Sequence, residues 1–381
     1  MSRASKLTSF SLFLILISLV FAISTFADSP QNDIMEQISD EIQYFKNSLP
    51  KEIIDFMPQE IWSGDFSQLL GNSFGEINLL ELVLNYLLSG LNNVLKSFSA
   101  ITVILIISSL FNALCSSSSN AVKNSFNIST SICVAIIIFK LCTSIASSTC
   151  SYLNGLNKIM ECFAPLMATL YILTGNVTSG TIASASFVLF ISLIENFLIS
   201  FMLPIVNICI CFSIIKSVGG YFDLSGISKS LKNTFTGVTV FVMSIFMFVL
   251  SCKSVLSQST DSISIKTAKF AISSFIPIVG TTVNDALRTI TSSISLIKNS
   301  CGIIAIIIIA IMMLPAIISL LLNRLLFNIT SSIAKCLNCN NECAVIDEAS
   351  SICGFLLALV LCTCILFIFA LTIMIKTTVV V

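Results

Sequence analysis

Two long apolar runs, residues 235–252 and 302–322, enclose a stretch of alternating character. Within 253–300 the apolar residues recur at spacings of three and four, which is the helical period; they are Ala268, Ile272 and Phe275 on one arm, and Val283, Leu287, Ile290, Ile294 and Ile297 on the other. Between the arms, Pro277 lacks an amide donor and disfavours helix before it, while Gly280 can adopt left-handed geometry. The pattern predicts a helical hairpin, broken between Phe275 and Gly280, that lies on or dips into a membrane.

Further apolar runs occur throughout the chain. Two of them, 160–174 and 203–215, are short for a crossing, because a span needs roughly 20 apolar residues. Of the 381 residues, 56% are hydrophobic and only 10% are charged, which is typical of a polytopic helical membrane protein. We therefore predict an all-α membrane protein with about six transmembrane helices, and at most eight. The runs in addition to those above are 98–115, 128–145, 160–174, 181–201, 203–215 and 353–375.

An internal repeat is suggested by the prolines. Phe163-Ala164-Pro165 resembles Phe275-Ile276-Pro277, and the next prolines, Pro204 and Pro315, follow at similar distances. We interpret this as a tandem same-direction repeat, in which each unit has a crossing helix, a proline-broken hairpin that is re-entrant or amphipathic, and a second crossing helix. The predicted units are 120–217 and 227–323, followed by a final helix at 345–375. Chance similarity between apolar stretches is the alternative.

Same-direction units require an even number of crossings each. If 158–199 and 266–300 are hairpins that do not cross, six spans remain, and both hairpins lie outside the cytoplasm. The cytoplasmic loops are then 116–127, 218–233 and 324–352, and the positive-inside rule supports this arrangement only weakly. The six predicted spans are 98–115, 128–147, 203–217, 234–252, 302–323 and 353–375.

The N-terminal part has a different character. Arg3 and Lys6 precede an apolar run at 10–23, which predicts a signal peptide over 1–27 with cleavage after Ala27, or alternatively an uncleaved anchor. Residues 28–96 hold eleven acidic side chains and three lysines. We predict a small helical extracytoplasmic head over 28–97, before a membrane domain over 98–381. Apolar residues at helical spacing mark one face of its first segment, at Ile34, Ile38, Ile42 and Phe45.

Polar residues inside apolar runs are the candidate functional groups, because burying them in lipid is costly. Lys140 lies in a predicted span and can instead extend its amine to the membrane surface. Glu195 lies in the second arm of the first hairpin and is the better candidate for a water-lined surface. The Ser/Thr-rich arms at 174–186 and 281–295 suit either a pore surface or close helix packing.

Catalysis, cofactors and nucleic acid are not indicated. The chain has no histidine, no glycine-rich phosphate loop and no clustered basic face of the kind that binds nucleic acid. Cys336, Cys339 and Cys343 approach metal-ligand spacing, but a structural zinc site needs four ligands and only Cys353 is nearby. We therefore predict no enzyme, no metal and no cofactor, and we assign these cysteines no role.

The central stretch resembles a known family. Thr267-Ala268-Lys269-Phe270 and 275–280 (Phe-Ile-Pro-Ile-Val-Gly), continuing through Asn284-Asp285-Ala286, closely resemble stage III sporulation protein AE. The resemblance covers essentially the whole chain, although the head is only loosely similar. Residues 336–343 depart from the family pattern, which has a Pro/Gly-rich turn there. We take as candidate hairpin or pore-lining residues Pro165, Glu195, Lys269, Phe275, Pro277, Gly280 and Asp285.

The resemblance implies a multi-pass protein of the cell membrane, made in the mother cell and located in the mother-cell-derived outer membrane around the forespore. It implies as partners the other stage III A sporulation proteins and stage II sporulation protein Q, in a channel or secretion-like complex that can hold one or several copies of the chain. That complex would sustain late gene expression in the forespore, with the acidic head meeting partners between the two membranes. Two alternatives remain open, an autonomous secondary transporter or permease and a structural scaffold for the complex.

Overall fold

A computed structural model describes residues 79–114, 120–174, 176, 180–181, 185–189, 191, 195–217, 224–275 and 280–376. The predicted signal peptide and the predicted head before residue 79 lie outside the described residues. Pro277 also lies outside them.

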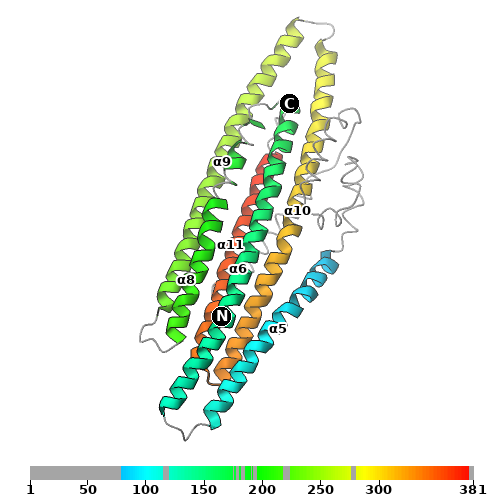
Figure 1. The fold of residues 1–381 in the computed structure, drawn as a ribbon. Helices are drawn as coiled ribbons and strands as arrows, with labels where there is room; N and C mark the ends of the chain where they lie inside the picture. The colour runs from blue at the N-terminus through cyan, green and yellow to red at the C-terminus, as the bar shows by residue number, and fades with distance from the viewer. Residues whose placement is uncertain are drawn as a thin grey trace.

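The described chain is built from long helices (Figure 1). The prediction of an all-α fold is confirmed, and the described ranges contain no strand. The elements are α5 (Leu79–Leu114), α6 (Asn120–Leu173), the π-helix η4 (Glu195–Ile199), α8 (Ser200–Ser217), α9 (Ser225–Phe275), α10 (Gly280–Cys336) and α11 (Asn340–Lys376).

Six segments of these helices are long and apolar enough to cross a membrane, as predicted. Each contains or largely overlaps one predicted span, so the chain is a multi-pass membrane protein. The segments are Val94–Leu114, Ser125–Ile172, Asn196–Ser217, Ser225–Ile263, Ile294–Cys336 and Asn340–Ile375.

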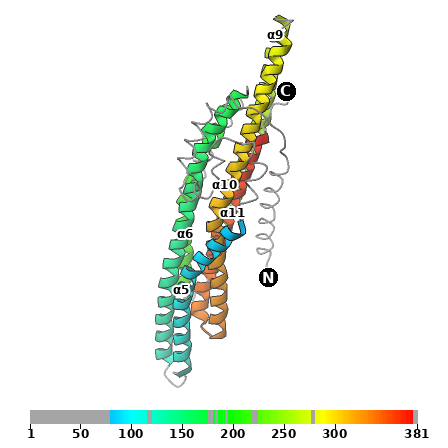
Figure 2. The ribbon, with the colours of Figure 1, turned by 90° about the vertical axis from the view of Figure 1, so that its right-hand side faces the viewer.

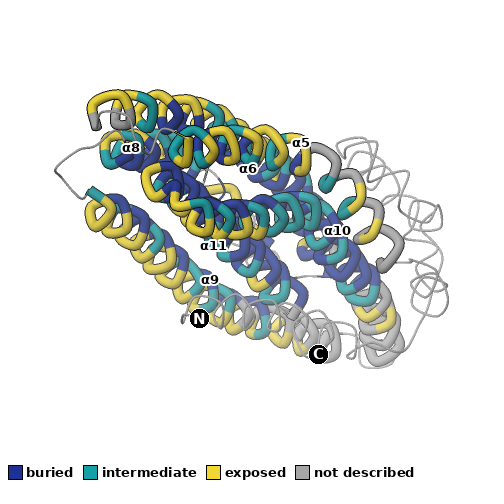
Figure 3. The backbone as a smooth tube through the Cα atoms, turned by 90° about the horizontal axis from the view of Figure 1, so that it is seen from below, coloured by how far each residue is buried: buried dark blue, intermediate teal, exposed yellow. Residues whose placement is uncertain are grey.

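Helix α11 lies at the centre of the bundle and contacts α6, α8, α9 and α10. In its most apolar stretch 72% of the residues are buried, whereas the value is 22% for α5 and for α9, which therefore lie at the periphery. Figure 3 shows exposed residues along the outward sides of α5 and α9. Exposed apolar side chains on these sides, such as Ile107 and Phe248, suit contact with lipid.

Several helix ends lie together at one end of the bundle, called the turn end here. The end of α5, the start of α6, the end of α8, the start of α9 and the α10–α11 turn all lie there, while α9 and α10 approach each other at the opposite end (Figure 1). The α10–α11 turn is tight because Asn338 adopts a left-handed backbone with φ of 57° and the Cys339 amide donates to the Ala334 carbonyl at 2.9 Å. The described parts of the predicted cytoplasmic loops thus share one end.

The helix break predicted at Pro165 is wrong. Helix α6 runs through Pro165 and ends only at Leu173. A proline removes one backbone hydrogen bond, but packing on both sides can compensate for that loss. Here Ala164, Leu166 and Met167 are all buried against the bundle, while Pro165 itself faces outward.

The helix break predicted between Phe275 and Gly280 falls between two described helices, since α9 ends at Phe275 and α10 begins at Gly280. However, its arms are not separate re-entrant segments, because each arm continues a crossing helix without interruption. Helix α9 has 51 residues and α10 has 57. At 1.5 Å per residue, α10 is about 85 Å long, far more than the roughly 30 Å of a hydrocarbon core. The outer parts of α9 and α10 extend beyond the other described helices (Figures 1 and 2).

A candidate functional site at the turn end

Three acidic residues near the start of α11 each contact a different set of helices. Glu342, Asp347 and Glu348 occupy the first turns of this helix. Glu342 lies in the first turn, where the unpaired amides carry partial positive charge and favour an acidic side chain. We call these three residues and their partners the turn-end network.

Glu342 connects α11 to α5 and α6. Its Oε1 accepts a hydrogen bond from the Thr130 hydroxyl at 2.7 Å and a longer one from the Ser108 hydroxyl at 3.4 Å. Only 3% of Glu342 is exposed, so its carboxylate depends on these hydroxyls in place of water. Hydrogen bonds to a charged group are stronger than those between neutral groups.

Glu348 connects α11 to α9. The Lys232 amine forms an ion pair with its Oε1 at 2.6 Å, and the side chains of Lys232 and Glu348 are 6% and 14% exposed. The Ser228 hydroxyl donates to the same oxygen, and Lys232 also contacts the Ser351 hydroxyl at 2.6 Å. The pair therefore has the additional hydrogen bonds that a buried ion pair needs.

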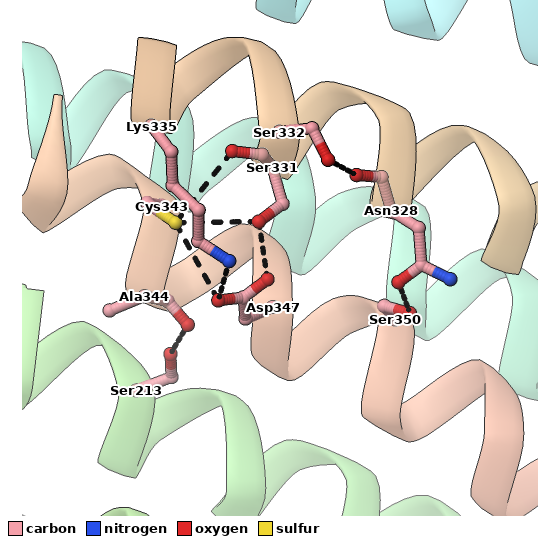
Figure 4. A network of polar contacts seen from close by, with 9 residues as sticks. All are labelled: Ser213, Asn328, Ser331, Ser332, Lys335, Cys343, Ala344, Asp347 and Ser350. Atoms are coloured by element: carbon pink, nitrogen blue, oxygen red, sulfur yellow. Dashed lines mark hydrogen bonds and ion pairs between the residues drawn. The ribbon is translucent and has the colours of Figure 1, made fainter. Parts of the chain in front are cut away.

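Asp347 connects α11 to the end of α10 (Figure 4). The Ser331 hydroxyl donates to its Oδ1, and Lys335 lies 3.2 Å from its Oδ2. The Cys343 thiol contacts both Ser331 and Asp347, at 3.3 Å from the Ser331 hydroxyl and 3.5 Å from Asp347 Oδ2. Lys335 and Asp347 are about half exposed, so this ion pair is the weakest part of the network.

A pocket opens beside the network, between α8, α9 and α11. Its volume is about 340 Å³, and charged and hydroxyl side chains line it together with the Phe212 ring. Lys216, Asp347 and Glu348 contribute charges of both signs. The turn-end network therefore holds α11 against its neighbouring helices, beside a pocket lined by polar side chains.

The cysteines of the α10–α11 turn are free thiols at different depths. Cys336 is exposed, whereas Cys339 and Cys343 are buried. Burial raises the pKa of the Cys339 thiol, so it stays protonated near neutral pH. The described residues contain no group of three or more His, Cys, Asp or Glu side chains placed to hold a metal ion.

Another buried basic residue, Lys298, lies away from the turn end. Lys298 belongs to the second arm of the predicted second hairpin and is fully buried, with its amine 4.4 Å from the centre of the Tyr171 ring. The Tyr171 hydroxyl donates to the Met374 carbonyl, so the ring is held between α6 and α11. A cation over an aromatic face is attracted by the ring's electrons, which offsets part of the cost of burying it.

The predicted hairpin residues are not brought together with this network. Pro165 lies on the outer side of α6, and Glu195 begins η4. Lys269 and Phe275 lie in the outer part of α9, while Gly280 and Asp285 begin α10, and nothing is described of these four side chains. Their proposed pore-lining role is not tested by the structure.

Sequence reasoning missed the turn-end network. Lys232 and Lys335 fall in the predicted cytoplasmic loops 218–233 and 324–352, and 336–343 was considered only as a cysteine cluster. The usable signal was the three carboxylates at the start of the last apolar run, opposite Lys232 at the start of another. Both sets of charges lie at the starts of spans that run in the same direction, so they fall at the same end of the bundle and are candidates for pairing.

The comparisons with known proteins complete the picture. The family model described as "Stage III sporulation protein AE (spore_III_AE)" matches residues 65–378, which include all six candidate spans. The chain belongs to the stage III sporulation protein AE family. Membership places it among sporulation membrane proteins rather than in a known enzyme family.

One curated relative is the stage III sporulation protein AE of Bacillus subtilis (strain 168), which is 31% identical over 146 residues. The alignment covers 37% of this chain and 37% of that protein. No solved structure matches the chain.

Proposed function

We propose that this chain is an integral membrane subunit of a channel or secretion-like complex between mother cell and forespore, located in the mother-cell-derived outer forespore membrane. The observation that carries the proposal is the family match, which extends through every candidate span and both arms at the α9–α10 end. The other stage III A sporulation proteins and stage II sporulation protein Q are the proposed partners. The complex would sustain late gene expression in the forespore.

The shape of the bundle is compatible with such a role. Helices α9 and α10 extend well beyond the length that a bilayer requires, at the end opposite the turn end. If the turns are cytoplasmic, this extension projects into the space between the two membranes, where partners from the forespore would be within reach. Phe275 at the end of α9 and Gly280 at the start of α10 lie at its tip.

Compartment-specific complementation tests the proposal. In a sporulating strain lacking the gene, expression from a mother-cell-only promoter should restore spore formation and a late forespore reporter, whereas forespore-only expression should not. A tagged copy should also co-purify other stage III A proteins from detergent-solubilised membranes. Restoration by forespore-only expression would contradict the proposed location.

The tip provides a sharper test of a path through the protein. Pro277→Leu combined with Gly280→Leu should abolish reporter activity at normal protein level if the tip shapes a path. Unchanged activity in that variant would reject this role and favour a scaffold. Uptake of solutes by the purified chain alone in liposomes would instead favour a permease.

A further inference from the structure

Where α5 and α6 meet Glu342 of α11, oxygen atoms outnumber the protons that can join them. Thr130 Oγ1 lies 2.7 Å from Glu342 Oε1, 3.0 Å from the Asn127 carbonyl oxygen and 3.4 Å from Ser108 Oγ. Ser108 Oγ also lies 3.4 Å from Glu342 Oε1. Because a hydroxyl carries a single proton, the two hydroxyls can serve only two of these four contacts.

The charge of Glu342 is also poorly compensated. Ser108, Thr130 and Glu342 are all buried, so water does not solvate the carboxylate. Within the described ranges no basic side chain pairs with Glu342, whereas Asp347 and Glu348 each have a lysine. The amides at the start of α11 supply only about half a positive charge. The contact therefore lacks a positive group.

Two asparagine side chains lie on the same interface, one helical turn nearer the loop between α5 and α6. Asn112 follows the serine of α5 by four residues, and Asn127 precedes the threonine of α6 by three, so each shares the face of its helix that forms the contact. The rings of Phe111 and Phe126 stack with their centroids 3.5 Å apart, which places these two turns side by side. The Oδ1 atom of each asparagine is buried and has no hydrogen-bond partner among the described residues. An amide oxygen only accepts, so both atoms call for a donor or a cation.

The oxygen atoms favour a hard cation that carries a single charge. Carboxylate, amide and hydroxyl oxygens are the ligands that such ions prefer. A divalent ion would leave excess positive charge buried beside one carboxylate, whereas a sodium ion makes the site neutral. With an ion bound, the lone pairs of both hydroxyls face it, and the Thr130 proton is free to donate to the Asn127 carbonyl of its own helix.

We infer that a sodium ion binds between α5, α6 and α11 at the turn end. Its ligands are the side-chain oxygens of Ser108, Asn112, Asn127, Thr130 and Glu342. The ion ties α5, a helix at the periphery of the bundle, to the central helix α11. This inference concerns ion binding by the chain itself and does not depend on the function proposed above.

Thermal unfolding of the purified full-length protein in detergent tests the site. When sodium chloride replaces choline chloride at constant ionic strength, the unfolding midpoint should rise by several degrees and then saturate, because a ligand that binds only the folded state stabilises it. Glu342→Gln should abolish this rise and the binding of radioactive sodium. The inference is overturned if the midpoint of the unaltered protein does not respond to sodium, if calcium raises it and sodium does not, or if Glu342→Gln keeps the full response.

Asn112→Leu separates a bound ion from an amide oxygen that simply has no partner. Without an ion, removing a buried unpartnered oxygen should leave the stability unchanged or raise it. With an ion, the variant loses a ligand, so it should be less stable than the unaltered protein in sodium but not in choline, and half of the sodium response should require a several-fold higher concentration. Asn207→Leu is the matched control, because its Oδ1 on α8 is also buried without a partner among the described residues, away from this site. If Asn112→Leu responds to sodium as Asn207→Leu does, the site is rejected.

A lysine amine is the alternative source of positive charge. Lys123 precedes Asn127 by four residues and so shares its face of α6, and nothing is described of the Lys123 side chain. Lys123→Met decides between the amine and the ion. The inferred site predicts the same sodium response with and without this substitution, whereas a response that arises only in Lys123→Met would assign the position to the amine and overturn the inference.

Discussion

Single residues at the turn end hold this bundle together through charge. Glu342 and Glu348 both lie near the start of α11, yet they receive hydrogen bonds from side chains of other helices. Each carboxylate therefore fixes the register of α11 against a neighbour. Apolar contacts between membrane helices cannot do this as specifically, because lipid competes for them equally well.

The Lys232–Glu348 pair gives the clearest residue-scale prediction. Replacing Glu348 with Leu leaves the Lys232 charge buried without its partner, which should cost about 3–5 kcal/mol. The double variant Lys232→Met with Glu348→Leu removes both charges and should recover most of that loss. Thermal unfolding of the purified protein in detergent measures both. If the double variant is no more stable than Glu348→Leu, the two side chains do not act as a pair.

Thr130 gives a second residue-scale prediction. Thr130→Val keeps the shape of the side chain but removes the hydroxyl that donates to Glu342 at 2.7 Å, and should cost about 1.5–3 kcal/mol. Thr143→Val on the same helix is the matched control, because its hydroxyl donates to carbonyls of its own helix. Equal unfolding temperatures for the two variants would show that Glu342 does not depend on Thr130.

At the scale of elements, the close contact between α10 and α11 depends on a glycine near the end away from the turn. A methyl group added at Gly302 would lie 2.3 Å from Cγ1 and 2.6 Å from Cδ1 of Ile375. Ile375 is β-branched and has few alternative rotamers in a helix. The two helices must then move apart, or Ile375 must leave its position.

Gly302→Ala should therefore destabilise the bundle by about 1–3 kcal/mol, the usual range for overpacking. Gly237→Ala is the matched control, because an added methyl group there meets no atom within 4 Å and alanine favours helix. Unfolding in detergent compares the two variants. A stabilised Gly302→Ala protein would mean that α10 and α11 are not packed as closely as described.

The elements also show what sequence can and cannot predict. Long apolar runs predict spans, because a bilayer requires a minimum length of apolar helix. The same pattern could not show that α6 continues through Pro165, since that depends on burial of its neighbours by distant helices. Nor could it pair Thr130 with Glu342, because periodicity indicates which face is buried but not what it meets.

At the scale of the whole molecule, the account depends on an even, antiparallel arrangement. Several helix ends lie together at the turn end, and the outer parts of α9 and α10 lie at the other end. The proposed role between two membranes needs the α9–α10 tip on the side opposite the turns. Helix α10 runs from the α9–α10 tip at Gly280 to the turn end at Cys336.

Labelling two positions on α10 tests this arrangement most directly. Cys336 is naturally exposed near the turn, and Thr289 is exposed near the tip. In protoplasts making a protein that retains Cys336 alone or Thr289→Cys alone, a membrane-impermeant maleimide should label Thr289→Cys in intact cells and Cys336 only after lysis. Labelling of both positions from the same side would contradict the account.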